Sequence, residues 1–251
     1  MPVASADLDL QASANMPIDD VTTSGGIQDA LRRPVFTQLA ANDTVEAISD
    51  NVGDTQNLTI RARDAAGNIV TETKAMNGTT FISFSTLGTV ERILSAELAS
   101  NAIGIVTVRR TSGATLIEDI PVGSRGFMIL FQDSASDPGS TKVRYEKMFW
   151  ENKHGTLSLT NAKVTLTADP SGKLTFDLED AVDDNNSAAN RLTEPTGLVG
   201  AWIGTGTSID VPGDGNLDAG EAIGTWLRQS LGVGDAPIKD TFDVKLEGQS
   251  T

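Results

Sequence analysis

The chain has 251 residues and a formal net charge of −15, with 34 acidic and 19 basic side chains. It contains no cysteine, which excludes disulfides, thiolate metal sites and cysteine nucleophiles. The acidic balance repels phosphate backbones and argues against nucleic acid as a partner. No run reaches the ~18 apolar residues of a membrane span, and the first residues lack the basic and apolar parts of a signal peptide.

The chain begins with a polar stretch of small side chains that is poor in aliphatic residues. Residues 1–34 therefore predict an extended N-terminal arm that contributes little to a core. Within it, "SGGIQDALRR" has a helical pattern that Pro34 stops within two turns. Ile27, Leu31, Val35 and Phe36 are the expected apolar partner-binding anchors at the base of the arm.

After the arm, short runs of threonine, valine and isoleucine between turn residues predict an all-β chain. "NLTIRARDAAGNIVTETKAM" predicts a hairpin with Gly67 in its turn. "IVTVRRTSGATLIEDI" predicts a second hairpin and "AKVTLTADPSGKLTFDLE" a third. Between the first two, residues 89–99 fit either a helix or a strand: their periodicity slightly favours a helix, whereas the flanking strands favour a strand.

These elements predict two consecutive β-sandwich modules, immunoglobulin-like or jelly-roll-like, behind the arm. The first module is expected over residues 35–122 and the second over residues 123–251, with the boundary near "PVGSRG". The second module is expected to carry a long acidic surface loop over residues 179–197.

One stretch suggests metal chemistry. In "DVPGDGNLDAGE", the acidic residues Asp210, Asp214, Asp218 and Glu221 take the first, fifth, ninth and twelfth positions of a calcium loop of the EF-hand kind. Pro212 stands at the third position, where it offers no side-chain oxygen, and no entering helix precedes the loop. The alternative is a glycine-rich turn between two strands, and the segment "AIGTWLRQSL" after it fits either an exiting helix or a strand.

Enzyme chemistry finds little support. His154 is the single histidine and lies at a strand-to-turn junction, and no Gly-x-Ser-x-Gly elbow exists. With 34 acids, a pair of carboxylates at glycosidase spacing is expected by chance. The sequence therefore predicts a protein that is not an enzyme and that holds no cofactor, with calcium at residues 210–221 as the open alternative.

Several phrases together resemble virion structural proteins of tailed bacteriophages. They are "LAANDTVEAISDNVGDTQNLTIRARDAAGNIVTETKAMNGTT", "TVERILSAELASNAIGIVTVRRTSG", "RYEKMFWENKHGTLSLTNAKVTLTADPSGKL" and "LDAGEAIGTWLRQSLGVGDAPIKDTFDVKLEG". They cover most of residues 35–248 and are structural patterns rather than catalytic motifs.

The resemblance implies a head decoration or cement protein, located in the virion, that binds the outside of the shell and stabilises it. Its implied partners are the major capsid protein and further copies of itself, as a homo-oligomer that analogy makes a trimer. The arm would lie over a neighbouring subunit, and its deletion would leave a folded domain that no longer binds particles. A tail, baseplate or head–tail joining protein is the alternative, and a calcium-dependent carbohydrate-binding or adhesin module is another.

Overall fold

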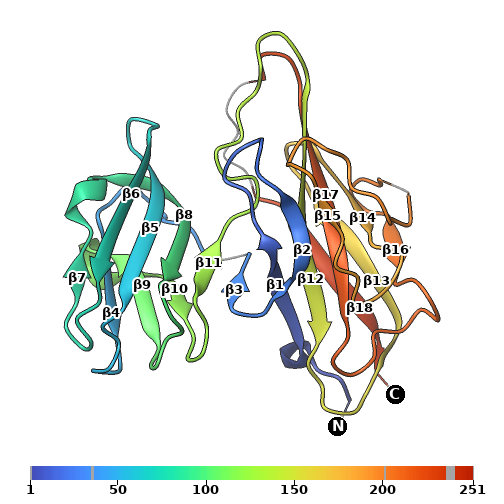
Figure 1. The fold of residues 1–251 in the computed structure, drawn as a ribbon, viewed down its shortest axis with the longest axis horizontal. Helices are drawn as coiled ribbons and strands as arrows, with labels where there is room; N and C mark the ends of the chain where they lie inside the picture. The colour runs from blue at the N-terminus through green and yellow to red at the C-terminus, as the bar shows by residue number, and fades with distance from the viewer. Residues whose placement is uncertain (1, 35–36, 201, 236–240, 251) are drawn as a thin grey trace. The chain divides into compact units, whose positions relative to one another are not determined.

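The structure is a computed structural model that describes residues 2–34, 37–200, 202–235 and 241–250. Its regular structure is almost entirely β, with strands in four sheets and only three short 3-10 segments in the described residues (Figure 1). The all-β fold of sandwich type predicted from the sequence is therefore confirmed.

The chain forms two compact units, and they do not follow one another along the sequence. Unit 1 combines Met1–Asp29 with Phe131–Thr251, and unit 2 is Ala30–Leu130. Unit 2 is thus inserted into the chain of unit 1. This differs from the predicted arm followed by modules over residues 35–122 and 123–251, because the first strands of the chain belong to the same sheet as strands from the segment 142–231.

Unit 2 has a four-stranded and a five-stranded sheet, ordered β10-β9-β4-β7 and β3-β11-β8-β5-β6. The strands are β3 (Arg32–Arg33), β4 (Val45–Ser49), β5 (Asn57–Asp64), β6 (Ile69–Ala75), β7 (Ile82–Ser83), β8 (Val90–Leu98), β9 (Val106–Arg110), β10 (Leu116–Ile120) and β11 (Gly126–Met128). Alternate apolar side chains of both sheets form one core, which includes Ala47, Ile60 and Val108. This alternation is why short Thr/Val/Ile runs form a sandwich here.

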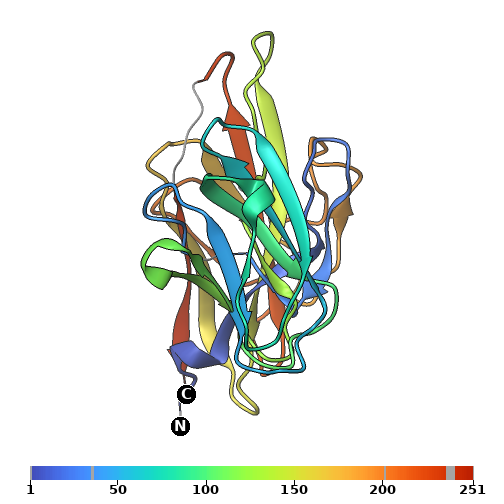
Figure 2. The same cartoon turned by 90° about the vertical axis from the view of Figure 1, so that its left-hand side faces the viewer.

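Two local predictions in unit 2 are confirmed, and one open alternative is decided. Strands β5 and β6 form the first hairpin, in which Gly67 has φ +89° and the Asp64 carboxylate accepts from the N–H groups of Ala66 and Asn68; the strands can be followed in Figure 2. Strands β9 and β10 form the second hairpin. The ambiguous segment is strand β8, paired with β5 and β11.

Unit 1 has a six-stranded sheet, β14-β17-β12-β1-β2-β15, and a three-stranded sheet, β16-β13-β18 (Figure 1). The strands are β1 (Leu8–Asn15), β2 (Ser24–Asp29), β12 (Lys142–Asn152), β13 (Leu159–Ala168), β14 (Leu174–Leu178), β15 (Ser187–Ala188), β16 (Ser208–Asp210), β17 (Ala222–Leu231) and β18 (Asp243–Ser250). The long β12 pairs with β1 on one edge and β17 on the other.

The predicted extended arm over residues 1–34 is wrong for its central part. Strands β1 and β2 are interior members of the six-stranded sheet, and the "SGGIQDALRR" segment begins with β2 instead of a helix. The segment is poor in aliphatics because its neighbours leave little room: a Cβ added at Gly25 would lie 2.5 Å from Cη2 of Trp226. Packing against Trp226 therefore requires a small residue at this position. The composition of the segment by itself predicts an extended arm, because it does not show this packing.

The predicted third hairpin is also wrong. Strands β13 and β14 are consecutive, but β14 pairs with β17 in the six-stranded sheet, whereas β13 pairs with β16 and β18 in the other sheet. The turn between them forms as expected, with Gly172 N–H donating to the carbonyl of Asp169. The local turn is therefore right, and competition for strand partners decides the pairing.

Candidate functional site

Residues 209–221 form a turn that leads into strand β17, which corresponds to the turn alternative of the sequence analysis. Trp226 on β17 is fully buried. Among the described residues, no group of three or more His, Asp or Glu side chains is placed to hold a metal ion. Asp210, Asp214, Asp218 and Glu221 are all described, and they do not form such a group. The Asp214 carboxylate accepts from Asn216, and the Glu221 carboxylate accepts from the Asp218 N–H.

Of the predicted partner-binding anchors, Ile27 and Leu31 lie within the described residues. Ile27 is on β2 and is 59% exposed, while Leu31 is half-buried before β3. Val35 and Phe36 lie outside the described residues. Because β2 is part of a sheet, Ile27 does not lie at the base of a free arm.

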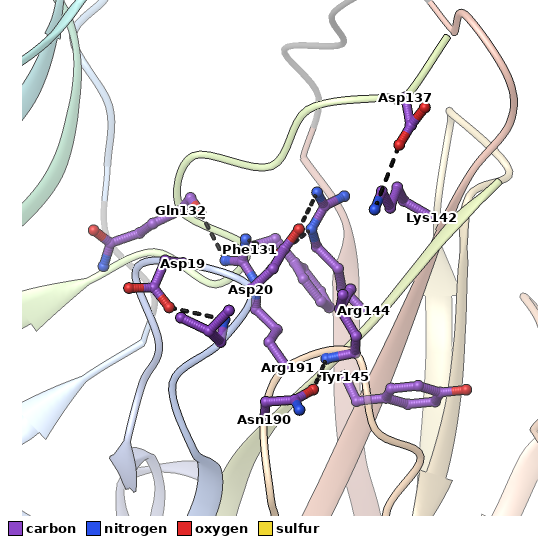
Figure 3. A network of polar contacts seen from close by, with 12 residues as sticks. Asp19, Asp20, Phe131, Gln132, Asp137, Lys142, Arg144, Tyr145, Asn190 and Arg191 are labelled. Carbon is purple, nitrogen blue, oxygen red and sulfur yellow. Dashed lines mark hydrogen bonds and ion pairs between the residues drawn. The ribbon is translucent and has the colours of Figure 1, made fainter. Parts of the chain in front are cut away.

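The most extensive charged network of unit 1 forms around Arg191, which the sequence did not single out (Figure 3). Its guanidinium donates from Nη2 and Nε to Oδ1 of Asp20 at 2.8 and 3.1 Å. Its Nη1 donates to the Gln132 carbonyl at 2.7 Å and to Oε1 of Glu146 at 3.2 Å. One buried arginine thus connects three segments that are far apart in the sequence.

A second arginine completes the network from strand β12. Arg144 donates to Asp20 from Nε at 2.6 Å and from Nη2 at 2.9 Å, a bidentate pair (Figure 3). Burial alone would raise the pKa of Asp20, but the hydrogen bonds from Arg144 and Arg191 outweigh it and hold that pKa below its ordinary value. Asp20 therefore stays ionised and fixes its loop to both arginines.

Glu146 is the other carboxylate of the network and is closed off from solvent. Burial raises its pKa to about 7, while Arg191 and the Phe131 N–H act in the opposite direction. The Phe131 N–H donates to Oε2 of Glu146 at 2.7 Å. The two arginines and two carboxylates balance each other in charge, which buried charges need in order to be tolerated.

Another buried ion pair lies further along β12. Lys147 Nζ donates to Oε1 of Glu179 at 2.5 Å and to the carbonyls of Gly26, Asp184 and Asn186. Burial raises the pKa of Glu179 to about 7, and Lys147 opposes that shift. The Lys147 ammonium therefore holds β2 and the first residues of the acidic segment 179–197 against β12.

The predicted surface loop 179–197 is thus partly buried. Its first residue, Glu179, and its Arg191 have almost no exposed surface, while Ser187–Ala188 forms β15 beside β2. The buried charges explain the difference, because a charged composition ordinarily predicts solvent exposure and ion pairing allows burial instead. No local motif could have revealed these pairs, since Asp20 lies 171 residues from Arg191.

Two loops tied together by this network present apolar side chains to solvent. We call residues 16–23 and 189–194 the loop pair; Asp20 of the first and Arg191 of the second join them. Val21 is 81% exposed, and Ile18 and Leu192 are also exposed. The Asp19 carboxylate accepts from the N–H groups of Val21 and Thr22, which fixes the turn that carries Val21. Such an arrangement suits recognition of a protein surface by preorganised apolar contacts.

No family model matches the chain, and no curated protein matches it. Among solved structures, it is similar to a chain from work on a chaperone–tip adhesin complex vital for synergistic activation of CFA/I fimbriae biogenesis. The two are 10% identical, the match covers 97% of this chain and 84% of that chain, and the TM-score is 0.21. A likeness of this size carries no argument about function. In the described residues, no helix is long and apolar enough to cross a membrane.

Proposed function

We propose that this protein is a non-enzymatic structural component of a tailed phage particle, a decoration protein that binds the outside of the head shell. The observation that carries the proposal is the loop pair, in which buried ion pairs hold exposed apolar side chains in place. A contact surface fixed before binding loses little conformational entropy when it docks, so a small surface can bind usefully. At many copies per shell, modest affinities add up.

Two further features support a structural role on the outside of a shell. The net charge of −15 disfavours contact with packaged nucleic acid. The buried charges of unit 1 hold loops to strands, as Lys147 and Arg191 show. Their partners Glu179 and Glu146 are closed off from solvent. These groups therefore serve the fold and are not open to a substrate.

The binding test is co-sedimentation of purified protein with separated phage heads and separated tails. Saturable binding to heads is expected, and Val21→Ser should weaken it, because Val21 is the most exposed apolar residue of the loop pair. Val122→Ser, an equally apolar exposed position in unit 2, is the matched control and should bind like the wild type. Binding to tails alone would move the protein to the tail or baseplate, and binding to neither would refute the proposal.

A second pair of variants tests whether fixing the loops matters. Asp20→Asn removes the carboxylate that two buried arginines share and should weaken head binding more than Asp19→Asn does. At Asp19 an asparagine oxygen can still accept from the turn N–H groups, so the turn should survive. Equal binding of the two variants, with both folded by circular dichroism, would show that loop fixation is irrelevant to docking.

A further inference from the structure

Strand β18 forms one edge of the three-stranded sheet of unit 1 (Figure 1). It is eight residues long and pairs with β13 alone. Among the described residues, only β13 forms hydrogen bonds with the β18 backbone, through the ladder and two threonine side chains; Val3 N–H reaches only the Ser250 hydroxyl at the end of the strand. An open edge of this length is a template for pairing with another strand.

The backbone groups that face outward can be assigned from two side-chain contacts. Thr167 Oγ1 donates to the Asp243 carbonyl and Thr160 Oγ1 to the Gln249 carbonyl, both from β13. The register irregularities of this pair add residues to β13, so β18 itself is regular between Asp243 and Gln249. Because backbone groups alternate along a strand, the N–H and C=O groups of Val244, Leu246 and Gly248 point to the open edge.

The side chains of β18 are self-complementary about Leu246. Lys245 and Glu247 flank it on the solvent face, with 57% and 35% of their side chains exposed. In an antiparallel pair of two β18 strands centred on Leu246, Lys245 of each strand lies opposite Glu247 of the other. Opposite charges directly across a ladder stabilise it, and like charges destabilise it.

We propose that a second copy of this chain pairs with it edge to edge, β18 against β18, about a twofold axis at Leu246. The outward N–H and C=O groups of Leu246 then exchange hydrogen bonds with those of Leu246 in the other copy, and Val244 lies opposite Gly248. The two three-stranded sheets become one continuous six-stranded sheet. This interface is isologous, so the same patch serves on both copies and the contact closes at two.

The geometry also places apolar contact at the centre of the interface. Leu246 is buried on the core-facing side of β18, on the opposite face from Lys245 and Glu247. In the paired strands the two Leu246 side chains become cross-strand neighbours, and each extends the core of the other. The two charge pairs and this contact set the register, which a strand with uniform side chains would leave free.

The first test measures the molar mass of the full chain by light scattering over a hundredfold range of concentration. The wild type is expected to shift from monomer to dimer. Lys245→Glu and Glu247→Lys should each raise the dimer dissociation constant at least about tenfold, because each places two like-charged pairs across the interface. Mixing the two variants should restore dimers, since one variant then presents only acidic side chains at positions 245 and 247 and the other only basic ones.

Amide hydrogen exchange is the second measurement and reads the interface directly. The amides of Leu246 and Gly248 should exchange more slowly at high protein concentration, whereas those bonded to β13 should not change. A protein that stays monomeric at every concentration overturns the proposal. So does a dimer that both charge variants leave intact. The measurements use the protein alone, so they are independent of whether it binds phage heads.

Discussion

At the scale of single residues, the fold of unit 1 depends on what surrounds Trp226. Its side chain is fully buried on β17, and its ring leaves no space for a side chain at Gly25 on β2. Gly25 also has φ +87°, a conformation that other residues adopt at a cost. The tryptophan and the glycine therefore form one packing unit, although 201 positions separate them.

Replacing Trp226 by alanine should lower the free energy of unfolding by about 3–5 kcal/mol, the cost of truncating a large core aromatic. Urea denaturation followed by circular dichroism measures it. Trp150→Ala is the control and should cost less, because Trp150 is only half-buried. A loss under about 1 kcal/mol at position 226 would contradict the packing described for the six-stranded sheet.

The raised pKa of Glu146 predicts how the free energy of unfolding changes with pH. Its pKa is raised from 4.5 to about 7 in the folded state, so between these values the folded protein binds the proton more tightly than the unfolded chain. Its contribution to stability is therefore fully present below about pH 4.5 and is lost as the pH rises through about 7. Asp20, with its lowered pKa, has the opposite pH dependence: its contribution to stability is present above its ordinary pKa of 3.8 and is lost as the pH falls below that value.

The measurement compares unfolding free energies at pH 5 and pH 8 for the wild type and Glu146→Gln. The wild type should gain roughly 1–3 kcal/mol more on acidification than the variant does, because glutamine cannot take up the proton. Glu179 contributes the same sign in both proteins and cancels in the difference. An identical pH dependence in both proteins would show that Glu146 does not titrate in this range.

At the scale of elements, the N-terminal strands matter more than their composition suggests. Strand β1 supplies one partner of the long β12, and β2 carries Gly25 and the carbonyl of Gly26 that accepts from Lys147. The buried positions of β1 include Gln11 and Ser13, which are polar. A search for alternating aliphatic residues misses such a strand. Its buried side chains are small or polar, and buried polar groups are tolerated when they form hydrogen bonds.

Deleting residues 1–29 should therefore unfold unit 1. The deletion exposes one edge of β12, uncovers Trp226 and leaves Arg144 and Arg191 without Asp20. Unit 2 should keep its structure, so hydrogen exchange should show lost protection in residues 142–152 and 222–231 and retained protection in residues 57–64. If the amides of unit 1 stayed fully protected from exchange in the truncated protein, residues 1–29 would be a dispensable arm, as the sequence predicts.

At the scale of the whole molecule, one unit is inserted into the chain of the other. The core of unit 2 is drawn wholly from residues between Leu39 and Phe127. Unit 1, by contrast, needs both ends of the chain, because β1 and β2 come from the first segment and β12 to β18 from the last. Unit 2 can thus become complete before the last strands of unit 1 are available.

The excised fragment of residues 30–130 should fold by itself. A single cooperative thermal transition and dispersed amide signals are expected, because its core cluster lies entirely within the fragment. Val45→Ala, at a fully buried position, is a matched destabilising control and should lower the melting temperature. A fragment without a cooperative transition would show that unit 2 depends on unit 1.

The sequence by itself determined the all-β class and the β5–β6 and β9–β10 hairpins, because local alternation and turn residues govern these features. Only the tertiary structure decided the rest. The turn at Asp169 forms in either arrangement, but the partners available to β13 and β14 assigned them to different sheets. The loop pair, too, exists only because the folded chain brings Asp20 to Arg144 and Arg191. Contacts between distant residues leave no periodic pattern in the sequence, since each depends on the path of the whole chain.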